Sequence, residues 1–344
     1  VQPGPMGGDI CWLKCPYCYG NTAKDLGERI TPERYVDIMT QIAEGGVKKV
    51  ICAGYATDPL FYEHIEDIVQ VALNYNQVFG FHTKAINISE RLVRQITLSS
   101  IAPLSYFSVS VDAGNNETYN KVHGVPQSQA KLYDKVVANI KRLVEARCEM
   151  KAPLDISATY LLNPLNSSTE EVLKSIHDLR ATGVDLIRFT FPQVPRGYSV
   201  GNNDSNIPSH EQITEYMKRL RPLVEKETDN QCQVLILDLD SMHDVYQVPR
   251  SLPCFARYVF PSIGFDGWLS HCSESAAPHF RDLAMGNLQT QDFWEVFYNY
   301  DVDDFQREVN GACSKMELLN CKCDRKEHVV NSRIKESGAF NDIT

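Results

Sequence analysis

Short apolar segments alternate with amphipathic segments over most of the chain. The apolar segments are rich in β-branched and aromatic residues, which is typical of buried strands. They lie at 48–53, 78–83, 105–112, 154–162, 184–191 and 233–239. We expect one more strand near the N-terminus, which would make 184–191 the sixth strand of the sheet.

Between these strands, apolar residues recur at the spacing of an α-helix. Thr31 is suited to cap the first helix, which should end at Gly45, and Ser89 is suited to cap the third. The other helices are expected at about 62–76, 117–122, 129–150, 168–181 and 210–227. The alternation predicts a parallel sheet with right-handed crossovers. The expected fold class is therefore α/β, with six units forming a partial, TIM-like (β/α)6 barrel.

This rhythm stops in the last quarter of the chain. We assign residues 1–249 to the barrel domain, 250–331 to a small cysteine-rich module and 332–344 to a polar tail without structure. Within the first part, 192–208 is rich in Pro, Gly, Asn and Ser and is interpreted as a long loop. Loops of this length often cover a binding site.

Composition and charge narrow the class of protein. The chain has 344 residues, 43% of them hydrophobic and 23% charged, which is ordinary for a globular protein. A net charge of −10 disfavours nucleic acid and leaves a small molecule or a basic peptide as partner. No apolar run is long enough for a bilayer, and the first residues do not resemble a secretory signal, so we expect a cytoplasmic protein. The cysteine motif begins only ten residues into the chain, so we expect that the natural N-terminus has been trimmed.

Three cysteines, Cys11, Cys15 and Cys18, stand within eight residues at C-x3-C-x2-C spacing. Thiolates are soft ligands that suit zinc and iron–sulfur clusters. A four-iron cluster is usually held by four thiolates, so three close cysteines would leave one iron open.

Three other interpretations of these cysteines were weighed. A disulfide framework does not suit a long chain without a secretory signal. Zinc sites usually pair C-x2-C with a second pair of ligands, and no such pair follows closely. Buried, unreactive cysteines are common singly, as we expect for Cys52, Cys148 and Cys232, but not three together.

The C-x3-C-x2-C motif resembles the signature of the radical S-adenosylmethionine (radical SAM) enzymes, in which Tyr17 would fill the usual aromatic position. The resemblance implies that Cys11, Cys15 and Cys18 hold a 4Fe–4S cluster whose open iron binds S-adenosylmethionine. It also implies reductive cleavage of that cofactor to a 5′-deoxyadenosyl radical, which abstracts a hydrogen atom from the substrate. The family's partial (β/α)6 barrel agrees with the periodicity.

Further segments are similar to cofactor-binding elements of the family. Thr57, Asp58 and Pro59 stand where relatives carry a Gly-Gly-Glu-Pro-like element, although the paired glycines are absent; a capped turn is the alternative. Ser110 and Asp112 match a Ser-x-Asp-Ala-Gly element, whose serine would bind the cofactor carboxylate.

The remaining candidates are His123, downstream of that element, and three residues at strand ends. Many relatives carry Arg where His123 stands, and imidazole cannot bind a carboxylate in the same bidentate way; an exposed His beside a turn is the alternative. Thr83 and Thr159 are candidates for contacts to the ribose, or ordinary strand threonines. Arg188 falls at the end of its strand and completes the predicted cofactor site.

The C-terminal cysteines resemble the auxiliary-cluster module called Twitch or SPASM. Cys254 and Cys272 flank a predicted hairpin with Asp266–Gly267 as its turn, and a stretch from Met285 resembles the module's Leu-Gly-Asn element before a helix. One auxiliary 4Fe–4S cluster is implied, with two ligands from Cys313, Cys321 and Cys323. Structural zinc, with His328 as a ligand, is the alternative.

The resemblance implies a radical SAM enzyme with a peptide substrate. The reaction would crosslink the peptide, epimerise one of its residues or excise part of its backbone. A separate protein could bind the leader of that peptide, and a flavodoxin or ferredoxin could supply electrons. The alternatives are a radical dehydrogenase or epimerase of a sugar or alcohol, and a non-catalytic iron–sulfur or zinc scaffold. We expect neither nucleic acid nor a membrane as partner.

Overall fold

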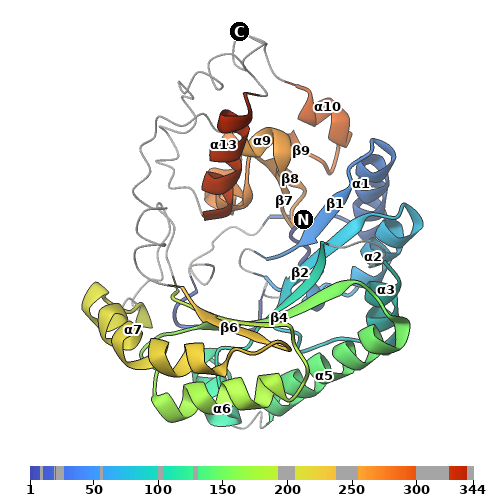
Figure 1. Cartoon of the computed structure of the whole chain (residues 1–344). Helices are drawn as coiled ribbons and strands as arrows, with labels where there is room; N and C mark the ends of the chain where they lie inside the picture. Colours follow the sequence, from blue (N-terminus) through green and yellow to red (C-terminus); the bar gives the residue numbers. More distant parts are fainter. Residues whose placement is uncertain are drawn as a thin grey trace.

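The computed structural model describes residues 1–7, 11–18, 20, 27–54, 57–99, 104–126, 131–192, 206–237, 255–299 and 325–338. Its main feature is a sheet of six parallel strands that follow one another in chain order. The strands are β1 (Lys49–Cys52), β2 (Val78–Thr83), β3 (Ser105–Ser110), β4 (Leu154–Leu161), β5 (Leu186–Thr190) and β6 (Gln233–Ile236). The sheet curves, and its helices cover the convex side (Figure 1). The α/β class and the partial barrel are therefore confirmed.

The crossover helices lie close to the predicted ranges. They are α1 (Pro32–Glu44), α2 (Ile65–Asn74), α3 (Glu90–Ser99), α4 (Asn116–Val122), α5 (Leu132–Met150), α6 (Thr169–Arg180) and α7 (His210–Val224). Thr31 caps α1 through the nitrogen of Arg34, and Ser89 caps α3 through the nitrogen of Leu92. Both predicted caps are thus confirmed.

The identity of the six strands differs from the prediction. The strand predicted at 184–191 is the fifth, and β6 (Gln233–Ile236) is the sixth. At the opposite edge, the nitrogen of Val1 donates to the carbonyl of Ile51 (2.7 Å), and Ala53 donates back to Val1 (3.0 Å). Val1 thus pairs with the outer edge of β1, but residues 1–7 and 11–18 form no strand, so the strand predicted near the N-terminus is not found among the described residues.

The two faces of the sheet carry different side chains. The face toward the helices is apolar and fully buried; its members include Phe81, Phe107, Ile156, Ile187 and Phe189. The residues that alternate with them are polar and partly exposed, among them His82, Tyr106, Ser110 and Arg188. Parallel sheets are usually apolar on both faces. The polar side chains on the concave face therefore indicate that this face lines a binding site.

A second, three-stranded sheet follows the barrel. It contains β7 (Ser262–Ile263), β8 (Trp268–Ser270) and β9 (Gly286–Asn287), with α9 (Ala256–Val259) before it and α10 (Phe293–Phe297) after it. The β7–β8 hairpin and its turn at Asp266–Gly267 are as predicted, with Gly267 at φ +81°. A helix also follows the Met285 stretch, as expected.

The second sheet is joined to the barrel through α1 and the N-terminus. Arg34 Nε donates to the carbonyl of Leu288 (2.8 Å), and Trp294 Nε1 donates to that of Gln41 (2.9 Å). The nitrogen of Gln2 donates to Ile263 of β7 (2.8 Å), while Val1 pairs with β1. The barrel and the C-terminal part are therefore both in contact with α1 and with the N-terminal residues.

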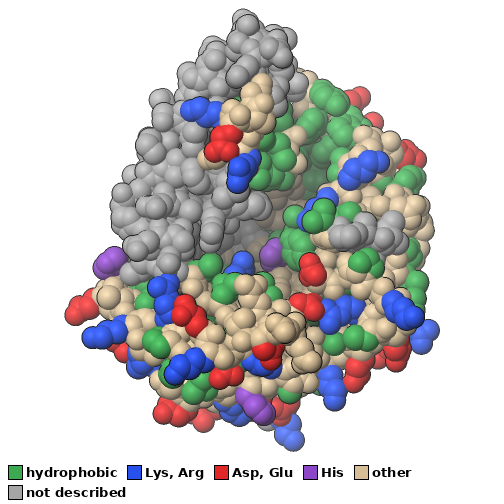
Figure 2. Space-filling model, in the orientation of Figure 1, with side chains coloured by type: hydrophobic (Ala, Val, Ile, Leu, Met, Phe, Trp, Pro, Cys, Tyr) green, Lys and Arg blue, Asp and Glu red, His purple; other side chains and the backbone are tan. Residues whose placement is uncertain are grey.

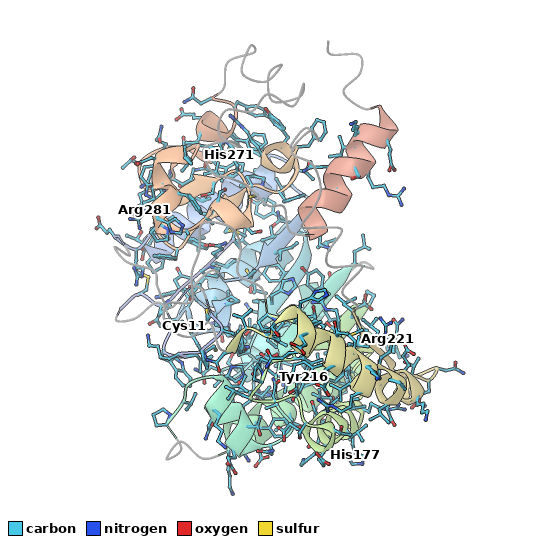
Figure 3. The ribbon with its side chains drawn as sticks, turned by 90° about the vertical axis from the view of Figure 1, so that its left-hand side faces the viewer. Cys11, His177, Tyr216, Arg221, His271 and Arg281 are labelled. Atoms are coloured by element: carbon cyan, nitrogen blue, oxygen red, sulfur yellow. The ribbon has the colours of Figure 1, made fainter. Side chains whose placement is uncertain are left out.

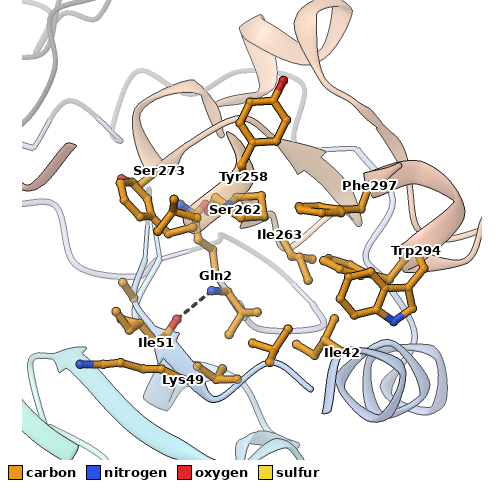
Figure 4. Close-up of a pocket in the computed structure, with 18 residues that line it drawn as sticks. Gln2, Ile42, Lys49, Ile51, Tyr258, Ser262, Ile263, Ser273, Trp294 and Phe297 are labelled. Atoms are coloured by element: carbon orange, nitrogen blue, oxygen red, sulfur yellow. Dashed lines mark hydrogen bonds between the residues drawn. The ribbon is translucent and has the colours of Figure 1, made fainter. Parts of the chain in front are cut away.

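An apolar cavity of about 370 Å³ lies along this junction (Figure 4). Ile42 of α1, Ile51 of β1 and Ile263 of β7 line it, together with Trp294 and Phe297 of α10. Figure 2 shows a recess walled by hydrophobic side chains over α10 and α1, whereas charges of both signs are interspersed over the barrel helices on the same face.

Two details differ from the sequence-based expectations. The last described helix, α13 (Arg325–Ser337), continues past residue 332, where we had placed a tail without structure. Asn331 fixes it, because its side-chain oxygen accepts from the nitrogen of Phe255 (2.8 Å). Cys52 and Cys232 are buried as predicted, but Cys148 is exposed. It lies in the last turn of α5, where Arg147, not Cys148, turns inward to the carboxylate of Asp185.

Among the described residues, no helix combines the length and the apolar character that crossing a bilayer requires.

The junction makes a specific prediction for Gly45. A Cβ at this position would lie 2.0 Å from the ring of Trp294. Because overpacking usually costs about 1–3 kcal/mol, Gly45→Ala should lower the free energy of unfolding by that amount in a denaturant titration. Gly7→Ala is the control, since nothing lies within 4 Å of its Cβ position. Equal stability of the two variants would contradict the packing described here.

Candidate active site

Cys11, the first residue of the cysteine loop (residues 11–18), lies between the barrel and the C-terminal part (Figure 3). The nitrogen of Lys14 donates to the carbonyl of His123, at the end of α4 (3.0 Å). Gly124 follows at φ +61°, and a Cβ there would lie 2.1 Å from the carbonyl oxygen of Lys14. Only glycine allows the loop to approach α4 this closely.

The three cysteines of the loop are free thiols. Cys15 is buried, and Cys11 and Cys18 are partly buried. Burial raises the pKa of Cys11 to about 12 and that of Cys15 further, and each is also raised by the neighbouring cysteines. Such thiols ionise only when a metal takes the place of the proton.

The cysteine sulfurs fit a metal site by their chemistry. Three thiols on one loop act electrostatically on one another, and no disulfide consumes them. In the part of the chain that the structure describes, no three His, Cys, Asp or Glu side chains converge closely enough to hold an ion. The donor set is therefore present, while its ligand geometry is not formed.

A buried ion pair connects the loop to the strands. The ammonium of Lys84, directly after β2, lies 2.7 Å from Asp112 Oδ2, just after β3. The hydroxyl of Tyr17 donates to the same carboxylate (2.8 Å). The aromatic residue of the cysteine motif is thus tied to the ends of two strands.

Asp112 is the centre of this network. It is fully buried at φ +57°, its Oδ1 accepts from the nitrogen of Leu161, and its carbonyl accepts from Asn166. Burial alone would raise the pKa of Asp112. The charges of Lys84 and His123 and the hydrogen bonds from Lys84 and Leu161 together outweigh burial, so the pKa lies below its usual value. The pKa of Lys84 is raised for the reciprocal reason. Both groups are therefore charged inside the protein.

His123 is fully buried, so the alternative of an exposed histidine is wrong. Its Nε2 faces the carbonyl of Val111 (3.2 Å), and its Nδ1 lies 3.3 Å from Cys15 Sγ. Burial, followed by the charge of Lys84, lowers the pKa of His123 to about 3. The neutral ring donates from Nε2, so Nδ1 accepts from the thiol of Cys15. His123 therefore packs behind the cysteine loop.

Asp58 forms the capped turn that we had weighed as an alternative. Its carboxylate accepts from the nitrogens of Leu60 (2.9 Å) and Lys84 (2.5 Å) and from the hydroxyl of Thr83 (2.6 Å). Thr83 is buried on the face of the sheet opposite to His82. Asp58 and Thr83 together fix the turn. The carbonyl of Thr57 lies against Gly54, where a Cβ would be 1.9 Å away.

Three predicted residues share one row of the sheet. Ser110 pairs with Thr159, and Thr159 pairs with Arg188, on the concave face of β3, β4 and β5. Arg188 Nη2 donates to the hydroxyl of Thr159 (3.4 Å). The sequence predicted these three residues singly, and the structure brings them together in one polar row across three strands.

A second polar group on this face was given no role in the predicted site. His82 Nε2 lies 2.9 Å from the hydroxyl of Tyr106, and the Lys49 ammonium lies 5.0 Å from the Tyr106 ring centre. A Cβ at Gly80 would lie 2.7 Å from that ring, so glycine allows the tyrosine to lie over the sheet. The sequence also placed Lys84 at a strand end near the predicted site, but gave it no role there. Its signal was a lysine directly after a strand, beside the predicted Asp58 and Asp112.

The predicted auxiliary site is described only in part. Cys272 follows β8, and its nitrogen donates to the hydroxyl of Ser275 (3.2 Å). The other predicted ligands lie outside the described residues: Cys254, Cys313, Cys321 and Cys323.

Residues 7–152 match the family profile described as the Radical SAM superfamily. The match spans the cysteine loop, both members of the buried ion pair and His123. The chain therefore carries a radical SAM domain. No curated protein sequence matches the chain.

Solved structures show a similar fold at low identity. SuiB of Streptococcus suis bound to S-adenosylmethionine has a TM-score of 0.58 and 15% identity, over 88% of this chain and 65% of that chain. SuiB bound to the precursor peptide SuiA gives 0.56 and 16%, over 91% and 66%. The structure of anSMEcpe with bound AdoMet gives 0.55 and 14%, over 97% and 94%. The chain thus spans less than two thirds of the SuiB chain, and the likeness concerns the fold.

The buried ion pair makes a stability prediction. Lys84→Met leaves the charge of Asp112 buried without a partner, which typically costs about 3–5 kcal/mol. Chemical denaturation followed by circular dichroism should show this loss. The double variant Lys84→Met/Asp112→Asn should recover part of it, because no charge remains buried.

The control is Lys121→Met, which removes an exposed pair with Glu117 one helical turn away. It should leave the unfolding midpoint unchanged. If Lys84→Met behaved like this control, the ion pair would not be what holds the loop to the strands.

Proposed function

We propose that the chain is a radical SAM enzyme that acts on a peptide. The observation that carries the proposal is the cysteine loop, fixed through Tyr17, Asp112 and Lys84 to the carboxyl ends of parallel strands. In barrels of parallel strands, chemistry is found at that end. The match of residues 7–152 to the radical SAM profile supports the same reaction class.

In this proposal Cys11, Cys15 and Cys18 hold a 4Fe–4S cluster with one open iron. When bound, the cluster and S-adenosylmethionine supply reductive cleavage and a hydrogen-abstracting radical. The protein's part is to keep the loop in place and water away. Burial of Cys15 between His123 and the ion pair serves both purposes.

The polar row on the concave face is the proposed cofactor site. Ser110 and Arg188 offer a hydroxyl and a cation to a carboxylate, and Thr159 lies between them to contact ribose. Arg188 is suited to a carboxylate because guanidinium binds it in a planar, bidentate way. The backbone at Thr57, held over Gly54 by the Asp58 turn, is the proposed contact for the amino group of the cofactor.

A peptide is the proposed substrate because a protein of similar fold, SuiB, has been solved with a precursor peptide bound. The concave face offers the exposed His82 and the half-buried Tyr106 for polar contacts. A separate leader-binding protein and a flavodoxin or ferredoxin as electron donor are proposed partners. Crosslinking, epimerisation and excision are the proposed outcomes of the reaction.

We also propose one auxiliary 4Fe–4S cluster of the Twitch or SPASM type in residues 250–331. Its ligands would be Cys254, Cys272 and two of Cys313, Cys321 and Cys323. The support is the predicted hairpin, which the structure contains and whose second strand ends two residues before Cys272.

The loop cysteines give the first test of this function. After anaerobic reconstitution, Cys11→Ser, Cys15→Ser and Cys18→Ser should each lose one cluster and all release of 5′-deoxyadenosine from S-adenosylmethionine and dithionite. Iron and sulfide analysis and chromatography measure the two losses. Cys148→Ser is the matched control, because Cys148 is an exposed thiol on α5. Zinc in the loop of the purified wild-type protein would rule the function out.

Iron content tests the auxiliary cluster separately. Two 4Fe–4S clusters correspond to about eight irons per chain and one cluster to about four. Cys272→Ser should therefore lower the content from about eight to about four while 5′-deoxyadenosine is still released. A wild-type protein with only about four irons would remove the auxiliary cluster but not the radical SAM activity.

A further inference from the structure

Tyr119 of α4 has a buried hydroxyl group whose hydrogen-bonding capacity is unused among the described residues. Its side chain is fully buried, and the hydroxyl has no hydrogen-bond partner in the part of the chain that the structure describes. Leaving a buried donor unpaired costs about 1–3 kcal/mol. A phenylalanine would avoid this cost, so the hydroxyl calls for a partner from outside the chain.

The position of Tyr119 indicates what that partner is. Its ring packs edge-on against His123, with 4.2 Å between ring centres, and His123 Nδ1 lies 3.3 Å from Cys15 Sγ. The charged groups that act on the hydroxyl are Asp112, Cys15, Asp58 and Cys11. Burial raises the pKa of Tyr119 well above its usual value, so the hydroxyl keeps its proton and remains a donor. It is thus a neutral donor beside the cysteine loop.

Another buried tyrosine hydroxyl, that of Tyr62, also lacks a partner among the described residues and provides a comparison. Tyr62 packs against Tyr35 of α1, with ring centres 5.7 Å apart. The charged groups that act on Tyr62 are Asp67, Glu63 and Glu33, and no cysteine of the loop is among them. Of the two hydroxyls, that of Tyr119 lies beside the cysteine loop.

We propose that the hydroxyl of Tyr119 donates a hydrogen bond to a sulfur of the iron–sulfur centre held by the cysteine loop and so raises its reduction potential. The inference rests on the proposed function. Reduction adds negative charge to the cluster, and a hydrogen bond to sulfur stabilises the more negative form. Tyr119 would then favour the electron uptake that precedes cleavage of the cofactor.

A redox titration of the anaerobically reconstituted full chain, followed by electron paramagnetic resonance, tests this. Tyr119→Phe should lower the equilibrium constant for one-electron reduction about tenfold, which is about 59 mV. Tyr62→Phe, which removes a buried hydroxyl that lacks a partner among the described residues and lies away from the loop, should leave the potential unchanged. A fully loaded Tyr119→Phe protein with the wild-type potential would overturn the proposal.

Unfolding with and without iron gives a second readout that needs no activity. Without iron, Tyr119→Phe should be at least as stable as the wild-type protein, because the hydroxyl then has no partner. With iron, the variant should gain less stability on reconstitution than the wild-type protein gains, or fail to retain the cluster. If the iron-free variant were less stable than the iron-free wild type, the hydroxyl would have a partner within the chain and the proposal would fall.

The failure of the proposed function would look different. A wild-type protein that binds no iron–sulfur cluster at the loop would show this before any variant is compared. An unchanged potential in a cluster-bearing Tyr119→Phe protein would instead concern Tyr119 alone.

Discussion

A lysine ammonium and an aspartate carboxylate meet inside the barrel, 2.7 Å apart, and the cysteine loop is held through them. Neither charge would be tolerated there alone, because an unpaired buried charge is far costlier than a paired one. Tyr17 and His123 pack around the pair and connect it to the loop. The position of three thiols thus depends on an electrostatic contact between the ends of two strands.

The sheet that carries this pair is asymmetric. Its convex face packs phenylalanine and isoleucine side chains under the helices, and this packing sets its shape. Its concave face presents hydroxyl, imidazole, phenol and guanidinium groups at regular spacing, because neighbouring parallel strands are in register. Apolar packing on one face therefore fixes the spacing of polar groups on the other, which is what a rigid binding site requires.

Periodicity predicted the fold well because most of its signals are local. The strand predicted at 78–83 coincides with β2, and the caps at Thr31 and Ser89 depend on residues three positions away. The candidate site depended on contacts between distant residues. From the sequence alone, Lys84 resembles an ordinary surface lysine, because its partner Asp112 follows a different strand. His123 resembles a turn residue, because the loop that buries it lies 108 positions earlier in the chain. Asp58 and Thr83 were predicted near the cofactor, but their bond to each other emerges only when two strand ends meet.

The helix that follows the cysteine loop belongs to two neighbourhoods. One side of α1 packs into the barrel through Ile38 and Met39, and its last turns accept Trp294 and Phe293 from the C-terminal part. A helix shared in this way cannot unfold for one neighbour and stay folded for the other. The two parts should consequently melt as a single thermodynamic unit. Any ion or ligand that binds only the folded form of one part then also stabilises the other by mass action. An ion bound in the C-terminal part would therefore raise the free energy of unfolding of the barrel without contacting it.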